Sequence, residues 1–207
     1  MENILSIIVP CYNEINLIEK FTTKLELIFN KINIKVIFVD DGSIDGTSQW
    51  LTKNIPIKFK NQKFKVINIK KNQGKGHAVK KAFPFIEGAY FGLIDSDLEY
   101  DPVDLLEMYK IISQNLTIDA LFGSRYIGGK IQHRKHFLND IAVRINTLIF
   151  NFLFAQSITD LHSGSKIMKS KILEKINLTN NDFGLEIDLS AQIVKNDFNI
   201  FEYGISY

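Results

Sequence analysis

Apolar runs that stop abruptly in acidic or polar residues recur along this chain, and they constrain its fold more than any other feature. Three of them end in the segments 10–14, 40–43 and 95–97. An apolar run of this length, bounded by turn residues, is typical of a buried strand. Carboxylates at the exits of such strands gather on one edge of a sheet, which is where open α/β sheets bind ligands. Because these like charges repel one another, we expect a cation to sit among them.

The order of strands and helices predicts an α/β fold. Strands are expected near residues 4–9, 34–39, 64–69, 89–94 and 118–123. Apolar residues at helical spacing fill the intervals between them. This alternation is typical of a Rossmann-like, mostly parallel sheet with helices on both faces. After residue 130 it breaks down, so we expect the last third to elaborate the same domain, which spans residues 1–207.

The composition excludes several classes of protein. A net charge of +2 is too small to indicate nucleic-acid binding. Cys11 is the only cysteine, which excludes an internal disulfide and fits a reducing, cytoplasmic compartment. We expect its role to be structural, although it lies beside the first motif. Residues 1–20 lack the pattern of a secretory signal, and no stretch reaches the ~18 uninterrupted apolar residues of a membrane-spanning helix.

Asp95 and Asp97 give the sharpest chemical signal. On an extended segment, side chains two residues apart share one face. A hard divalent cation, Mg²⁺ or Mn²⁺, is held in phosphate sites by one or two carboxylates together with phosphate oxygens. Such an ion also stabilises the negative charge that develops on a departing diphosphate. An isolated Asp-x-Asp also occurs in turns with side-chain hydrogen bonds, and it is the preceding apolar strand that favours a metal site here.

The order of four segments, 7–14, 39–43, 72–76 and 94–97, resembles the inverting nucleotide-sugar glycosyltransferases of family 2. The resemblance is strongest to the branch that makes polyprenyl-phosphate sugars, such as dolichyl-phosphate mannose and glucose, and it spans essentially the whole chain. It implies an A-type glycosyltransferase fold and transfer, with inversion, from a UDP- or GDP-linked sugar to a polyprenyl or dolichyl phosphate. It also implies a nucleotide-sugar half at about 1–126 and an acceptor half at about 127–207.

The same resemblance implies roles for residues on the nucleotide side. Eight positions would bind the nucleotide-sugar: Pro10, Tyr12, Glu14, Val39, Asp41, Lys75, Asp95 and Ser96. Asp95, Asp97 and Glu99 would hold the metal, Glu99 standing where this branch often has Gln. Asp41 would accept an N–H from the base, although segment 40–43 also suits a strand-to-helix turn with an N-cap. Lys75 would approach the diphosphate or sugar, or lie solvated in its loop.

On the acceptor side, Gly123-Ser124-Arg125-Tyr126 matches a Gly-Ser-Arg element of the family. Arg125 is a planar donor fork suited to a phosphate, or else to a surface salt bridge. Segment 159–166 resembles a second family motif. It makes Asp160 a candidate general base, or a carboxylate that orients the acceptor or Arg125, and Lys166 a candidate contact to the acceptor phosphate. His162 is expected to be structural, and Glu186 and Asp188 suit either a helix start or the acceptor.

A basic stretch at 130–136 precedes the apolar residues 141–155. Together they suit an amphipathic helix on a membrane carrying anionic lipid, so we expect peripheral contact through about 130–155 at the cytoplasmic face. A core helix beneath a polar loop is the alternative. Members of this branch usually continue past the last strand, which we expect near 200–207, into a basic segment.

Two rival functions stay open. The first is transfer to a saccharide or protein hydroxyl, which would need a true general base at Asp160. The second is a non-catalytic module that binds a sugar nucleotide or a lipid head group. Intact Asp95 and Asp97 argue against the second.

Overall fold

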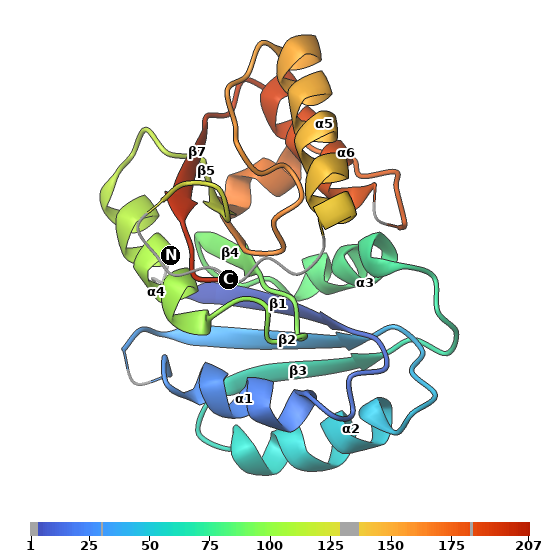
Figure 1. The fold of residues 1–207 in the computed structure, drawn as a ribbon. Helices are drawn as coiled ribbons and strands as arrows, with labels where there is room; N and C mark the ends of the chain where they lie inside the picture. Colours follow the sequence, from blue (N-terminus) through green and yellow to red (C-terminus); the bar gives the residue numbers. More distant parts are fainter. Residues whose placement is uncertain (1–3, 30, 129–136, 183) are drawn as a thin grey trace.

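The computed structural model describes residues 4–29, 31–128, 137–182 and 184–207. In these residues the chain forms one seven-stranded sheet with helices on both faces, in the strand order β3-β2-β1-β4-β6-β5-β7 (Figure 1). All pairs are parallel except those of β6. The mostly parallel α/β sheet predicted from the sequence is therefore confirmed.

The first half alternates strand and helix as predicted. Its elements are β1 (Leu5–Cys11), α1 (Ile18–Glu26), β2 (Ile34–Asp40), α2 (Thr47–Lys58), β3 (Lys63–Asn68), α3 (Lys75–Ala82), β4 (Tyr90–Leu93) and α4 (Pro102–Gln114). A 3-10 turn, η1 (Phe83–Phe85), follows α3. Asp101 caps α4 by accepting from the Val103 N–H, and Pro102 takes the first helical position, where its missing N–H costs nothing.

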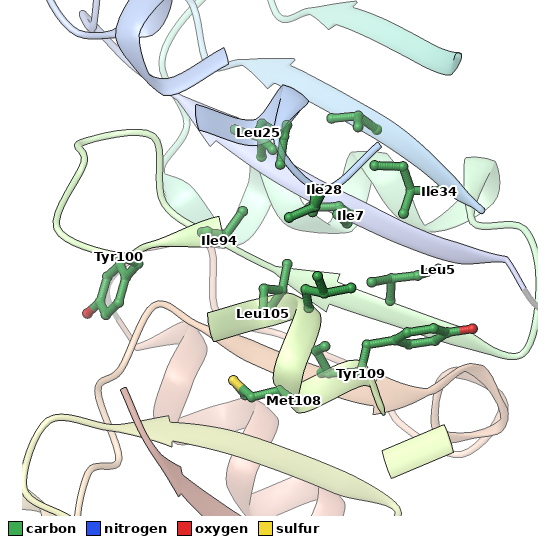
Figure 2. Packing of buried hydrophobic residues seen from close by; sticks show 14 of the residues in the cluster. Leu5, Ile7, Leu25, Ile28, Ile34, Ile94, Tyr100, Leu105, Met108 and Tyr109 are labelled. Carbon is green, nitrogen blue, oxygen red and sulfur yellow. The ribbon is translucent and has the colours of Figure 1, made fainter. Parts of the chain in front are cut away.

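Alternate residues of β1 enter two cores. Leu5, Ile7 and Val9 pack with α1, α2 and α4 on one face. Figure 2 shows Leu5 and Ile7 in this cluster with Leu25 of α1 and Leu105 of α4. Ile8 points to the other face and packs with α3 and the late helix α6 (Leu185–Lys195). This period of two follows from the pleat of the strand.

The last third of the chain comprises β5 (Ala120–Ser124), α5 (Phe137–Phe154), β6 (Lys166–Lys169), the 3-10 turn η2 (Ser170–Glu174), α6 and β7 (Ile200–Gly204). Of these elements, strand β6 was not predicted from the sequence. Strand β6 lies antiparallel between β4 and β5, with Lys166 paired to Leu93. Because β6 runs the opposite way, it begins where the parallel strands end. Segment 159–165, which precedes it, therefore reaches the same edge as segment 94–97.

Candidate active site

Two cavities open at the carboxyl edge of the sheet. The Tyr12 cavity has a volume of about 400 Å³ and is lined by Pro10, Cys11, Tyr12, Glu14, Asp41, Asn72, Gly74, Lys75, Ala78, Asp95, Ser96, Asp97 and Asp182. The Arg125 cavity has a volume of about 420 Å³ and is lined by Lys75, Asp95, Glu99, Tyr100, Arg125, Tyr126, Asn139, Asp140, Ala142, Val143, Asn146, His162, Glu186 and Tyr207. Lys75 and Asp95 belong to both, so the two cavities meet at this pair.

Lys75 lies between two carboxylates at this junction. Its Nζ is 2.8 Å from Asp95 Oδ1, 2.9 Å from Asp95 Oδ2 and 2.8 Å from Glu186 Oε1. Burial alone would lower the pKa of Lys75, but the two carboxylates outweigh it and raise that pKa above its ordinary value. Lys75 is therefore a fixed ammonium in this structure, not the solvated loop lysine of the alternative interpretation.

Carboxylates crowd the Tyr12 cavity. Burial, followed by the charges of Asp97, Asp45 and Asp95, raises the pKa of Glu14 to about 7. Burial, followed by the charges of Asp95 and Glu99, raises the pKa of Asp97 to about 6, although the Glu99 N–H opposes the shift. Their negative charge is therefore only partly compensated by the protein itself, which is the situation that a bound cation relieves.

The donor chemistry of Asp95 and Asp97 fits a hard divalent cation. Both offer carboxylate oxygens to the Tyr12 cavity, and an ion bound with a diphosphate needs only one or two protein carboxylates. Among the described residues no three His, Cys, Asp or Glu side chains come together as a metal cluster. Glu99, the third predicted ligand, lines the other cavity, where its Oε2 accepts from the Tyr207 hydroxyl at 3.2 Å.

Asp41 organises the loop that closes the Tyr12 cavity. Its carboxylate accepts from the Gly74 N–H at 2.7 Å and from the Gln73 N–H at 3.1 Å. Burial raises the pKa of Asp41, and these two N–H groups oppose the rise. Ser96 is held similarly, since its hydroxyl donates to the Pro10 carbonyl at 3.1 Å. Gly42 has a φ of +73°, and a side chain there would collide with the Asn72 backbone.

Two of the predicted contact residues lie away from the cavities. Val39 was predicted to flank the base, but its side chain is fully buried in the core on the α3 face and does not line the Tyr12 cavity. The Lys166 side chain is also buried, and its ammonium donates to the backbone carbonyls of Leu161 and Ser163 instead of reaching a phosphate. Burial lowers the pKa of Lys166 to about 8. In both cases the pleat of the strand turns the side chain away from the edge.

Arg125 and Asp160 form a closely bonded pair. Arg125 donates from Nε to Asp160 Oδ2 at 2.7 Å and from Nη2 to Oδ1 at 2.9 Å, and its backbone N–H also donates to Oδ2. Asp160 is fully buried, whereas Arg125 lines the cavity. Burial alone would lower the pKa of Arg125, but Asp160 outweighs it and raises that pKa. Of the two interpretations of Asp160, this geometry favours the orientation of Arg125 over proton abstraction.

Two residues that sequence reasoning missed support this pair. The Glu202 carboxylate, on β7, accepts from the Thr159 N–H at 2.8 Å and from the Asp160 N–H at 3.0 Å. The Tyr207 ring lies 5.1 Å from the guanidinium of Arg125. Both residues lie in the closing segment 200–207, whose apolar alternation indicated only a strand.

His162 lines the Arg125 cavity, with its Nε2 3.3 Å from Asn146 Nδ2. Burial lowers the pKa of His162, so the ring is neutral near pH 7.

Helix α5 borders the Arg125 cavity and exposes an apolar face. Its large exposed side chains are Leu138, Ile141, Ile145, Leu148, Ile149, Phe152 and Leu153. Asp140 ties the helix to the cavity by accepting from the Tyr126 hydroxyl at 2.7 Å, and it also pairs with Arg144 Nε of the same helix at 2.9 Å. No helix within the described ranges is both long and apolar enough to cross a bilayer. The predicted basic stretch at 130–136 lies outside the described residues.

Comparison with known proteins identifies the family. The family described as Glycosyl transferase family 2 matches residues 6–177. This chain belongs to that family. It is 29% identical over 191 residues to the dolichyl-phosphate beta-glucosyltransferase of Saccharomyces cerevisiae, covering 84% of this chain and 57% of that protein. It is 26% identical over 189 residues to the dolichol-phosphate mannosyltransferase of Pyrococcus furiosus, covering 88% of this chain and 50% of that one. The chain thus spans little more than half the length of these two relatives.

The solved structures that resemble this family 2 chain confirm the A-type glycosyltransferase fold. Glucosyl-3-phosphoglycerate synthase from Mycobacterium tuberculosis, in complex with UDP, superposes with a TM-score of 0.74 at 18% identity. The match covers 99% of this chain and 71% of that one. Another structure of the same enzyme, with Mn²⁺, UDP and glucosyl-3-phosphoglycerate, has a TM-score of 0.75 at 16% identity.

Proposed function

We propose that this protein transfers a sugar, with inversion, from a UDP- or GDP-linked donor to a polyprenyl or dolichyl phosphate. The observation that carries the proposal is the meeting of the two cavities at Lys75 and Asp95. A donor in one cavity and an acceptor in the other would place the anomeric carbon at that junction. Such an arrangement suits in-line displacement, because the nucleophile approaches the anomeric carbon from the side opposite to the departing diphosphate.

The nucleoside diphosphate belongs in the Tyr12 cavity in this proposal. Tyr12 offers a flat face to the base, Glu14 can accept from ribose hydroxyls, and Asp41 holds loop 72–74. Asp95 and Asp97 would hold Mg²⁺ or Mn²⁺, with Glu99 as a further candidate. When bound, the ion would stabilise negative charge on the departing diphosphate. The Mn²⁺ and UDP of the solved neighbour support this assignment.

The lipid phosphate belongs in the Arg125 cavity. Arg125 would bind the phosphate, and Asp160 would fix the orientation of its guanidinium. A phosphate oxygen would form the new bond to the anomeric carbon as the bond to the diphosphate breaks, and the nucleoside diphosphate would leave with the bonding electrons. Because a phosphate is already ionised near neutral pH, this step needs no general base. Asp160 is buried, which agrees with a step that needs no general base.

This assignment divides one domain, residues 1–207, into a nucleotide-sugar half at about 1–126 and an acceptor half at about 127–207. The apolar face of α5 would then lie against the cytoplasmic face of a membrane, beside the cavity that takes the lipid phosphate. The names of the yeast and Pyrococcus furiosus relatives support a lipid-phosphate acceptor.

A screen of UDP- and GDP-sugars with Mn²⁺ or Mg²⁺ and short polyprenyl phosphates in detergent tests the proposal. We expect metal-dependent release of the nucleoside diphosphate only when a polyprenyl phosphate is present. Transfer to a saccharide or protein hydroxyl, with polyprenyl phosphate ignored, would overturn the acceptor assignment and make Asp160 the base to examine. Binding of nucleotide without any transfer would favour a binding module.

A further inference from the structure

The ammonium of Lys75 bridges the two halves of the candidate site. Asp95 follows β4, at the exit of the donor half, and Glu186 lies in the first turn of α6, in the acceptor half. All three side chains are shielded, with exposed fractions of 20% for Lys75, 22% for Asp95 and 9% for Glu186. Glu186 was ambiguous in the sequence, where a helix start explained it equally well.

Lys75 occupies the position that a metal ion at Asp95 would need. Its Nζ contacts both carboxylate oxygens of Asp95, at 2.8 and 2.9 Å. A divalent cation on those oxygens would lie within a few ångströms of the ammonium, and like charges at such a distance repel strongly in a shielded site. Lys75 must therefore withdraw from Asp95 when an ion binds there.

Glu186 offers the withdrawn ammonium a second partner. Its Oε1 already lies 2.8 Å from Nζ, so Lys75 can leave Asp95 without becoming an unpaired buried charge. Burial alone would raise the pKa of Glu186, but the ammonium groups of Lys75 and Lys166 outweigh it and lower that pKa. The carboxylate is therefore ionised near neutral pH and able to hold Lys75.

We propose that Glu186 is a positioning residue that draws the Lys75 ammonium away from Asp95 and so frees this carboxylate for the metal ion. The inference rests on the metal-dependent function proposed above. Without the charge of Glu186, Lys75 would pair with Asp95 alone and compete with the ion. Glu186 thus acts through Lys75 and needs no contact with the ion.

The test measures Mn²⁺ binding directly, by electron paramagnetic resonance of free Mn²⁺ in the presence of saturating UDP or, in a parallel series, GDP. We expect Glu186→Gln to weaken Mn²⁺ binding ~5- to 10-fold, the usual scale of coupling between two sites. Glu186→Asp, which keeps the charge, should lie closer to wild type. Glu107→Gln removes a carboxylate that pairs with Lys110 on the surface of α4, and it should leave Mn²⁺ binding unchanged.

A double substitution isolates the mechanism. In the Lys75→Met background there is no ammonium to draw away, so adding Glu186→Gln should have no further effect on Mn²⁺ binding. An effect of Glu186→Gln that persists in this background, or wild-type Mn²⁺ affinity in Glu186→Gln alone, would overturn the inference. If the wild-type protein binds no Mn²⁺ with either nucleotide, the metal-dependent function itself fails. Thermal unfolding of each variant identifies any loss of fold.

Discussion

Asp97 offers the most direct test of the metal site at the scale of single residues. We expect Asp97→Ala to abolish metal-dependent nucleotide binding and to leave the free energy of unfolding unchanged or slightly higher. The raised pKa of Asp97 means that its ionised form is disfavoured in the fold, so removing the charge relieves the cost of burying it and its repulsion by Asp95 and Glu99. Calorimetric titration of UDP and GDP with and without Mn²⁺ checks the first point, and urea unfolding the second. Equal affinity of wild type and variant in the presence of Mn²⁺ would contradict the prediction.

Arg125 tests the acceptor side. Arg125→Ala would leave Asp160 buried and unpaired, so Arg125→Lys is the better variant because it keeps a cation there. A lysine loses the bidentate fork, so we expect kcat/KM for polyprenyl phosphate to fall. The fall should correspond to a loss of about 1.5–3 kcal/mol in transition-state stabilisation, the scale of a hydrogen bond to a charged group. The Kd of the donor nucleotide, measured by calorimetry, should not change. Weakened binding of the donor nucleotide would indicate that Arg125 contacts the diphosphate of the donor and not the phosphate of the acceptor.

The sequence predicted the individual residues of the Tyr12 cavity better than those of the Arg125 cavity. Residues such as Tyr12, Asp41 and Asp95 follow strands, and parallel strands bring their exits to one edge. The contact between Glu202 and Asp160 spans 42 positions and depends on the pairing of β5 with β7, which no local pattern indicates. The burial of Val39 and Lys166 likewise depends on which face of a strand meets the core.

At the scale of elements, β6 shows where sequence patterns stop being informative. The strand has only four residues, with lysines at both ends, so its pattern resembles a loop. Its position comes from pairing with β4 and β5 on either side, which supplies the hydrogen bonds that its composition does not indicate. The parallel strands β1, β2 and β4 were predictable because each is largely apolar and ends in a turn signal.

Strand β6 also makes stability depend on pH through Lys166. The pKa of Lys166 is about 8 in the folded protein, whereas its ordinary value, which applies to the unfolded chain, is 10.5. Between these two values the unfolded chain binds more protons, so the free energy of unfolding rises as the pH rises. We expect the wild type to gain about 1 kcal/mol between pH 7 and 9 relative to Lys166→Met. Urea unfolding at both pH values measures this, and Lys110→Met, at an exposed lysine, should match the wild type. A parallel pH dependence in Lys166→Met would contradict the prediction.

Helix α5 carries the prediction about the membrane. Phe152 and Leu153 are 87% and 67% exposed, so replacing both with serine should not disturb the core. If this face enters a lipid surface, the double variant should bind vesicles of mixed neutral and anionic lipid at least ~10-fold more weakly, because each buried apolar side chain contributes about 1.5–3 kcal/mol. Sedimentation with vesicles measures it. Leu116→Ser changes an equally exposed leucine away from α5 and should have no effect. Equal vesicle binding by the wild type, the double variant and Leu116→Ser would exclude this face of α5 as the membrane contact.

At the scale of the whole molecule, the halves meet where segment 159–165 approaches segment 94–97. Gly164 lies at this contact, and a Cβ on it would overlap the carboxylate of Asp95 and come within 2.9 Å of the Tyr100 ring. The φ of Gly164 is not in the left-handed region, so the residue is required for space and not for backbone conformation. The close approach fixes the position of the Asp95 carboxylate at the junction of the two cavities.

Gly164→Ala should therefore disturb both halves through one methyl group. Displacement of the Asp95 carboxylate from its place beside Asp97 in the Tyr12 cavity would weaken the binding of UDP or GDP with Mn²⁺, and transfer should fall with it. A single core overpacking of this kind also lowers the free energy of unfolding by about 1–3 kcal/mol. Calorimetric titration and urea unfolding measure the two effects. Gly128→Ala is the matched control, because nothing lies within 4 Å of a Cβ built there, and it should behave as wild type. If the two alanine variants bind nucleotide and metal equally well, the close packing at Gly164 does not position Asp95.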